Sequence, residues 1–170
     1  GLIPKGVYNF LWVTKFPLFE YSTEDGRYYA KHHPFTAPMD EDISLIGKDN
    51  DKVRSKAYDI VLNGYELGGG SIRIHDSDMQ SMILNQLGFT QQDVEARFGF
   101  LTNALRYGAP PHGGFAIGMD RLVMLLCGTD NIKDVIAFPK MQNARCLLSD
   151  APSQVEKAQL DELGITLVKE

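Results

Sequence analysis

The chain has 170 residues, of which 44% are hydrophobic and 23% are charged, and its formal net charge is −5 at pH 7. This composition is ordinary for a globular protein, so it excludes a disordered chain and a coiled coil, and the length predicts a single domain. The sequence pI near 5.3 argues against a protein that coats DNA, because broad phosphate binding needs a cationic surface. A local basic cleft for one phosphorylated ligand is still compatible with it.

The two isolated cysteines and the short apolar runs exclude further classes of protein. Cys127 and Cys146 stand alone, which excludes a disulfide scaffold and a zinc finger and suits a reducing compartment. The longest wholly apolar run, 122–127, is too short to cross a bilayer, so we expect no membrane partner. Residues 1–5 form no signal peptide and lack an initiator Met, which indicates a processed chain or a piece of a longer one.

The first half of the chain is dominated by strand signals. Aromatic and β-branched runs predict strands, in chain order, at 8–13, 16–21, 27–30, 57–62, 65–67 and 71–75. A polar turn at 22–26 makes one hairpin. Asn63-Gly64 makes another, because these residues tolerate the positive φ angles of a type I′ turn. Prolines hold 32–38 extended, and the polar stretch 40–52 predicts a mobile surface loop.

The second half contains mainly helical signals. Apolar periodicity predicts helices over 79–87, 91–107 and 119–127, and a last one at the capping box Ser153-x-x-Glu156. Asp76 or Ser77 can cap the first helix and Thr90 the second. A strand at 114–118 leads into the third helix, and a short segment follows at 132–138. Since hairpins and helices follow one another without βαβ alternation, we expect an α+β fold, an antiparallel sheet with helices packed on one side.

Two carboxylates face each other across the second hairpin. A two-residue turn places Val61 opposite Glu66 and Asp59 opposite Gly68, so Asp59 and Glu66 lie diagonally on one face of the sheet. Such a pair repels unless a cation or water separates it. It predicts either a Mg²⁺ site shared with a substrate phosphate or two solvated surface acids.

A glycine strip precedes a single arginine. Gly68-Gly69-Gly70 gives up side-chain packing, which a strand tolerates at a bulge or where a ligand approaches the backbone. Strict alternation places Arg73 on the face opposite Glu66, but a glycine bulge can shift that phase. Arg73 could then grip a carboxylate bidentately. The alternative is a flexible loop with a surface arginine.

Arg121 and the histidine pair are further candidates. Arg121 lies in the first turn of a helix that its apolar residues predict to be buried, so a half-buried guanidinium there needs an anion. That anion is either Asp120 or a nearby acid, or a bound polyphosphate. His32 and His33 are adjacent on an extended segment and point opposite ways, so they do not chelate one metal, and packing is their simpler role.

Taken together, these residues resemble bacterial-type aspartyl-tRNA synthetases. The resemblance runs nearly from end to end and is carried by His32 to Thr36, Asn63 to His75, Tyr107 to Arg121 and Asp134 to Lys140. It implies that the chain is the C-terminal part of a class II catalytic domain, with motif 3 at 114–126. The family also has an anticodon-binding domain, a motif 1 and a motif 2, which do not occur in these residues. Ala116 and Asp120 depart from the general class II pattern and are ordinary for the aspartyl subgroup.

The resemblance also implies roles for the candidate residues. ATP binding falls to Glu66, Gly118, Met119, Asp120 and Arg121. Glu66 and Asp59 would hold Mg²⁺, and Glu66 and Arg121 would be the catalytic pair. Arg73 would grip the aspartate side chain, with His32 and His33 in the same aspartate pocket.

The activity implied is that of an aspartate–tRNA ligase, which activates L-aspartate with ATP and transfers it to the 3′ end of tRNA(Asp) in translation. The resemblance implies a homodimer in the cytoplasm, or in mitochondria for an organellar version, with no DNA partner. We expect the 170 residues to be inactive alone. The alternatives are an asparaginyl-tRNA synthetase, an asparagine-making paralogue or a non-catalytic interaction module. Whether asparagine tRNA is charged too is decided outside these residues.

Overall fold

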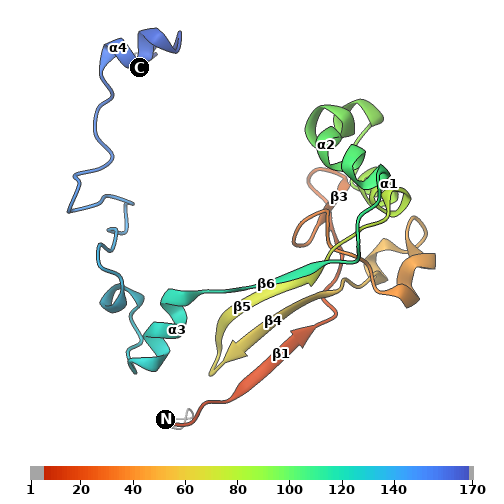
Figure 1. Ribbon diagram of the computed structural model, residues 1–170, viewed down its shortest axis with the longest axis horizontal. Helices are drawn as coiled ribbons and strands as arrows, with labels where there is room; N and C mark the ends of the chain where they lie inside the picture. Colours follow the sequence, from red (N-terminus) through yellow and green to blue (C-terminus); the bar gives the residue numbers. More distant parts are fainter. Residues whose placement is uncertain (1–5, 169–170) are drawn as a thin grey trace. The chain divides into compact units, whose positions relative to one another are not determined.

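The computed structural model describes residues 6–168, so the prediction for residues 1–5 lies outside the described residues. The chain forms two compact units, one ending at Leu122 and the other beginning at Val123. The length had predicted a single domain. The two units are described separately below, and the first contains the sheet (Figure 1).

A four-stranded antiparallel sheet forms the centre of the first unit. It is built from β1 (Phe10–Thr14), β4 (Ala57–Leu62), β5 (Tyr65–Ile72) and β6 (Gly113–Ile117), in the order β1-β4-β5-β6. Each neighbouring pair is antiparallel. The predicted α+β class with an antiparallel sheet is therefore confirmed. The glycine strip belongs to β5, which continues without interruption from the Asn63-Gly64 turn.

A second, smaller sheet lies with two helices of the first unit (Figure 1). The predicted hairpin is confirmed as β2 (Phe19–Ser22) paired with β3 (Arg27–Ala30), although β2 is shorter than the run that predicted it. Figure 1 places α1 (Ser77–Gln86) and α2 (Gln91–Arg106) with this hairpin at one end of the four-stranded sheet, whereas packing along one side was expected. One buried hydrophobic cluster consists of Leu18, Phe19, Ile46, Val53, Ile74, Ile83 and Leu87.

Side-chain caps begin both helices where the sequence indicates. Asp76 accepts a hydrogen bond from the Met79 N–H at 2.8 Å, so Asp76 and not Ser77 is the cap of α1. The Thr90 side chain accepts a bond from the Asp93 N–H, and the Asp93 carboxylate accepts one from the Thr90 N–H, which completes a capping box at the start of α2. These bonds satisfy donors that a helix start leaves free, which explains why α1 and α2 begin at these positions.

The segment 40–52 is not the mobile loop that its polarity predicted. It forms two short 3₁₀ helices, Asp40–Leu45 and Asn50–Lys52, and it buries Asp42 and Asn50. Arg54 donates from Nε to Asp42 Oδ2 at 2.7 Å and from Nη2 to Oδ1 at 2.9 Å. These bonds lower the pKa of Asp42 to about 2. A paired and buried carboxylate therefore ties this segment down.

The second unit differs from its prediction in two ways. The helix α3 (Met119–Leu126) spans the boundary between the units, and it buries only Met124, although its apolar sequence predicted a buried helix. The last helix, α4, covers only Lys157–Glu162, after a 3₁₀ turn at Ile132–Val135. Glu156 has an extended backbone and no side-chain cap bond. The predicted capping box at Ser153 is therefore wrong, because the residue meant to be its third helical position lies outside the helix.

Candidate functional site

The β4–β5 hairpin starts as predicted and then departs from it. Asn63 and Gly64 both have positive φ, 50° and 88°, as a type I′ turn requires. Val61 faces Glu66, but the register then shifts, so that Asp59 faces Gly69 where Gly68 was expected. Leu67 is the extra residue of this β-bulge. The bulge lies one residue before the glycine strip.

This bulge changes which side chains share a face. Without it, Glu66 and Arg73 would lie on opposite faces of the strand, since they are seven residues apart. The extra residue restores the phase, and Gly69, Ser71 and Arg73 then follow Glu66 on one face. All four line a single cavity of about 670 Å³. The phase shift that the sequence left open is therefore present.

The three glycines let β5 come close to its neighbours. A Cβ atom at Gly68 or Gly70 would collide with the carbonyl oxygens of Ala116 or Gly114 on β6. A Cβ atom at Gly69 would collide with Asp59 Oδ1. The alternative of a flexible loop is thus wrong. The glycines form a strand whose bare backbone makes the floor of the cavity.

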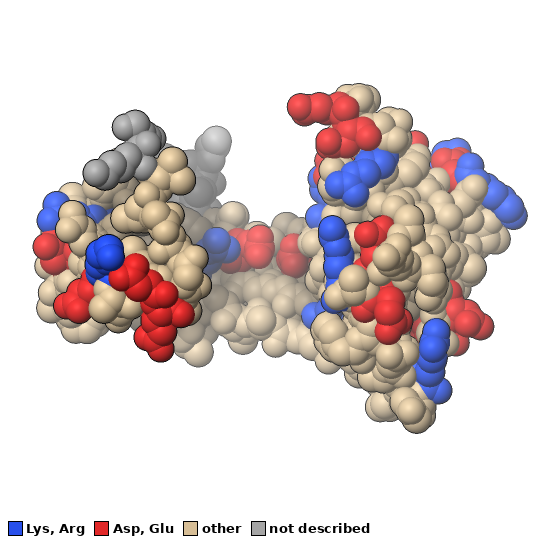
Figure 2. All heavy atoms as spheres, turned by 90° about the horizontal axis from the view of Figure 1, so that it is seen from above, with Lys and Arg blue, Asp and Glu red and all other residues tan. Residues whose placement is uncertain are grey.

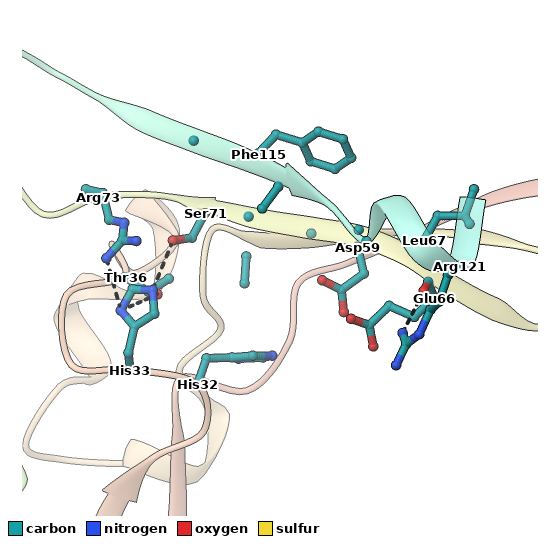
Figure 3. Close-up of a pocket in the computed structure, with 17 residues that line it drawn as sticks. His32, His33, Thr36, Asp59, Glu66, Leu67, Ser71, Arg73, Phe115 and Arg121 are labelled. Atoms are coloured by element: carbon teal, nitrogen blue, oxygen red, sulfur yellow. Dashed lines mark hydrogen bonds between the residues drawn. The ribbon is translucent and has the colours of Figure 1, made fainter. Parts of the chain in front are cut away.

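Asp59 and Glu66 occupy one end of the cavity, with their carboxylates close together (Figure 3). Burial raises the pKa of Asp59, and the charge of Glu66 raises it further. No salt bridge joins either carboxylate to a Lys, Arg or His among residues 6–168. The described residues also hold no cluster of three or more metal-ligating side chains. Two carboxylates with no cationic partner suit Mg²⁺, which takes one or two carboxylates and further oxygens from substrate phosphates.

Arg121 stands beside this acidic pair. The Gly118 N–H donates to the Leu67 carbonyl at 2.7 Å, which attaches the start of α3 to the bulge. Arg121 Nη1 donates to the backbone carbonyl of Glu66 at 2.7 Å. Its side chain is exposed, so the expected half-buried position is wrong. No salt bridge among the described residues joins it to Asp120 or to another acid, which leaves the alternative of a bound polyphosphate. Gly118 lines the cavity as Arg121 does, whereas Met119 and Asp120 do not.

Arg73 stands at the other end of the cavity (Figure 3). Its backbone N–H donates to the His112 carbonyl at 2.9 Å, and Ile74 N–H donates to the Phe35 carbonyl at 2.9 Å. Thr36 forms a β-bridge with Arg73. The loop that contains the two histidines is therefore paired with the end of β5. This pairing explains how residues forty positions apart meet.

The two histidines line the same cavity, although an extended segment would have pointed them apart. The chain bends at His32, so the alternation of an extended segment does not hold. The His32 ring packs edge-on against Phe16 with their centroids 4.9 Å apart. His33 is half-buried beside Arg73, and burial, followed by the charge of Arg73, lowers its pKa.

Three lining residues with polar or aromatic side chains were not among the candidates. Thr36 and Ser71 are buried polar residues beside His33, and Phe115 lines the cavity from β6. Ser71 was detectable, because it lies two residues before Arg73 and so shares its face. Thr36 and Phe115 had no such signal, since they reach the cavity only through tertiary pairing.

The surface charge is mixed. Lys and Arg are interspersed with Asp and Glu on the face drawn in Figure 2, and no broad cationic area forms there. This agrees with the net charge of −5. Among the described residues, no helix is both long and apolar enough to span a bilayer.

Comparison with known proteins identifies the family. Residues 3–142 match the model of the class II tRNA synthetases (D, K and N). The chain belongs to this family. It is 59% identical over 167 residues to the aspartate–tRNA ligase of Macrococcus caseolyticus (strain JCSC5402). It is 60% identical over 168 residues to the aspartate–tRNA(Asp/Asn) ligase of Lachnoclostridium phytofermentans.

Solved structures support the same fold. The aspartyl tRNA synthetase of Entamoeba histolytica matches with a TM-score of 0.58 at 26% identity, over 79% of this chain and 23% of that one. The two ligases above are matched over 98% and 99% of this chain, respectively, but over only 28% of their own lengths. The chain therefore spans little more than a quarter of these class II relatives.

Proposed function

We propose that this chain forms the part of an aspartate–tRNA ligase that binds the amino acid and the phosphates of ATP. The observation that carries the proposal is the cavity on β5, with Arg73 at one end and Asp59, Glu66 and Arg121 at the other. A cation suits the side-chain carboxylate of aspartate, and acids that hold Mg²⁺ suit a polyphosphate. The names of the relatives at about 60% identity support the same assignment.

The reaction proceeds in two steps. The α-carboxylate of aspartate attacks the α-phosphorus of ATP, which forms aspartyl-adenylate and releases pyrophosphate. A hydroxyl of the terminal adenosine of tRNA(Asp) then attacks the acyl carbon and releases AMP. Neither step needs a poised nucleophile from the protein, so catalysis comes from positioning and charge compensation. The cavity fits this demand, because its polar groups are arginines, histidines and carboxylates.

Each candidate residue has a part in these steps. Arg73 binds the side-chain carboxylate of aspartate, with His32 and His33 beside it. Asp59 and Glu66 would hold Mg²⁺, which would supply positive charge to the phosphate oxygens. Arg121 adds a cation at the same end. Gly118 is placed to let the phosphates approach the backbone, and Met119 and Asp120 complete the motif 3 turn.

The larger context belongs to the same proposal. We place the chain as the C-terminal part of a catalytic domain, in a cytoplasmic homodimer that contains motif 1, motif 2 and an anticodon-binding domain elsewhere. An asparagine-specific relative is disfavoured by Arg73, since a guanidinium suits a carboxylate and not a carboxamide. A non-catalytic interaction module is disfavoured by the uncompensated acid pair, for which folding alone gives no reason.

A hybrid enzyme tests the proposal. The segment of the Macrococcus caseolyticus ligase that matches this chain is replaced by these residues, and ATP–pyrophosphate exchange is measured with aspartate and with asparagine. We expect exchange with aspartate and at least 100-fold less with asparagine, a ratio typical of a site built around one charged group. The unmodified ligase is the control. A soluble hybrid that exchanges equally with both amino acids, or with neither, would contradict the proposal.

A further inference from the structure

His33 lines the cavity, and its hydrogen-bond partners determine which ring nitrogen carries the proton. The backbone N–H of Phe35 donates to His33 Nδ1 at 3.2 Å. A backbone N–H can only donate, so Nδ1 must present a lone pair and carry no proton. The remaining nitrogen, Nε2, then carries the single proton of a neutral ring.

The other contacts of the ring agree with this tautomer. His33 Nε2 lies 3.3 Å from Thr36 Oγ1 and 3.5 Å from Ser71 Oγ, and both hydroxyls can accept its proton. Thr36 Oγ1 also lies 3.4 Å from Nδ1, to which its hydroxyl can donate. Thr36 and Ser71 are themselves buried, at 1% and 4% exposure, so this end of the ring is fixed in place. The ring therefore has a defined orientation between the histidine loop and β5.

Arg73 uses the same lone pair. Its Nη1 lies 3.5 Å from His33 Nδ1, a long hydrogen bond in which only the arginine can donate. Figure 3 shows the guanidinium and the imidazole facing each other at this end of the cavity. A proton on Nδ1 would bring an imidazolium against a guanidinium and remove the acceptor for two donors at once.

We propose that neutral His33 is a positioning residue that holds the Arg73 guanidinium toward the cavity, so that protonation of His33 weakens binding of a carboxylate-bearing amino acid. This role rests on the proposed function, in which Arg73 binds that carboxylate. The charged and titratable groups that act on His33 are Arg73, at the end of β5, and His32, on its own loop. Burial and both of these groups keep its pKa below that of a free histidine.

The tautomer can be read directly on the 170-residue chain. The chain has four histidines, so long-range ¹H–¹⁵N spectra of labelled protein resolve each ring, and the His33→Gln variant assigns its signals. We expect an unprotonated Nδ1 and a protonated Nε2 on His33, with a pKa below that of a free histidine. In Arg73→Leu the pKa of His33 should rise, because the nearby positive charge is removed. The opposite tautomer, or a pKa of His33 that does not change in Arg73→Leu, overturns the proposal.

The kinetic consequence is measured in the hybrid ligase defined above. His33→Ala should raise the KM for aspartate about tenfold, a loss expected for one hydrogen bond to a charged group, with little change in the KM for ATP. His33→Gln keeps an acceptor and should recover most of the loss, and His75→Gln is the matched control. In the wild-type hybrid the KM for aspartate should rise as His33 takes up its proton, and His33→Gln should remove that rise.

The outcomes separate this inference from the proposed function. Equal increases in the two KM values, or one pH profile shared by wild type and His33→Gln, would overturn the positioning role while aspartate activation stands. A hybrid that does not activate aspartate at all would overturn the proposed function and with it this role for His33. The NMR result for the tautomer would be unaffected by that failure.

Discussion

At the scale of single residues, the two ends of the cavity carry side chains of opposite charge. Arg73 stands at one end, and the paired carboxylates of Asp59 and Glu66 stand at the other with Arg121 beside them. No salt bridge among the described residues involves Arg73, Asp59 or Glu66, so each end suits a ligand group of opposite charge. Because the charges are divided in this way, the contribution of each residue can be separated by measuring the KM for aspartate and the KM for ATP in each variant.

Arg73→Lys in the hybrid ligase should affect aspartate and not ATP. A lysine keeps the charge but loses the fork of donors that matches a carboxylate, so we expect the KM for aspartate to rise about 10- to 100-fold. The KM for ATP should change less than about twofold. Steady-state pyrophosphate exchange with each substrate varied gives both values. An unchanged KM for aspartate would remove Arg73 from the amino-acid pocket.

Asp59→Asn and Glu66→Gln in the hybrid should each weaken Mg²⁺-dependent ATP binding, by about tenfold, because each removes a charged oxygen ligand. Excess Mg²⁺ should recover part of the activity, since mass action offsets a weaker site. ATP titrations at several Mg²⁺ concentrations measure this. If both variants behaved as wild type at every Mg²⁺ concentration, the two carboxylates would not form a metal site.

The same acid pair should cost stability when no metal is bound. Because the pKa of Asp59 is raised in the folded chain, ionising it disfavours folding, and the cost grows as pH rises above the ordinary aspartate value. Asp59→Asn should therefore raise Tm at pH 7 by roughly 2 °C and leave it unchanged near pH 3. The matched control is exposed Asp130→Asn. A lower Tm for Asp59→Asn at pH 7 would show that the carboxylate stabilises the fold.

The residues at the acidic end could be largely predicted from the sequence. Alternation on a two-residue hairpin placed Asp59 and Glu66 on one face, and the turn dipeptide Asn63-Gly64 fixed the start of the register. The contacts at the other end could not be predicted. Whether His33 meets Arg73 depends on a bend and on strand pairing between distant segments, and local residue patterns contain neither.

At the scale of elements, Gly68 and Gly70 allow β5 and β6 to lie close together. A methyl group at Gly70 would collide with the Gly114 carbonyl, so Gly70→Ala should destabilise the chain by about 1–3 kcal/mol, as overpacking does. Urea unfolding measures the change. Gly114→Ala is the matched control on the partner strand, because no atom lies within 4 Å of its added methyl, and we expect it to be near neutral. Equal effects of the two variants would show that close approach is not the reason for Gly70.

The predicted elements differ in how far apart in the sequence the residues that stabilise them lie. Helices α1 and α2 start where Asp76 and Thr90 form caps, because a cap is a contact within a few residues. The segment 40–52 was mispredicted, because the pairing of Asp42 with Arg54 spans twelve residues and turns a polar stretch into a fixed one. The exact position of the bulge was also out of reach, because contacts with β6 help to decide it.

At the scale of the whole molecule, the four-stranded sheet has two unpaired edges among the described strands, β1 and β6. Phe10, Leu11 and Trp12 of β1 are 61%, 57% and 55% exposed. An open edge with apolar side chains is a surface on which other chains assemble. We therefore expect the isolated 170-residue chain to self-associate, which light scattering at increasing concentration would detect.

The isolated chain should also show no robust pyrophosphate exchange. Among the described residues that line the cavity, Arg121 is the arginine at the acidic end, and one cation leaves much of the charge of a triphosphate uncompensated. Loss of one preorganised contact typically costs about 10²–10³ in rate. Exchange by the chain, with the hybrid ligase as positive control, tests this. A monomeric chain as active as the hybrid would show that these residues suffice.

The bulge at Leu67 also limits how the strand can change in length. Because side chains alternate, inserting or deleting one residue between Glu66 and Arg73 would turn Ile72 or Ile74 toward the end of the cavity that Arg73 now occupies and move the guanidinium to the other face. Only changes of two residues keep both ends of the cavity chemically intact, and each such step would lengthen or shorten it by about 7 Å. Changes in the length of this strand can therefore alter the distance between the two ends of the cavity only in coarse steps. Finer adjustment must come from the side chains.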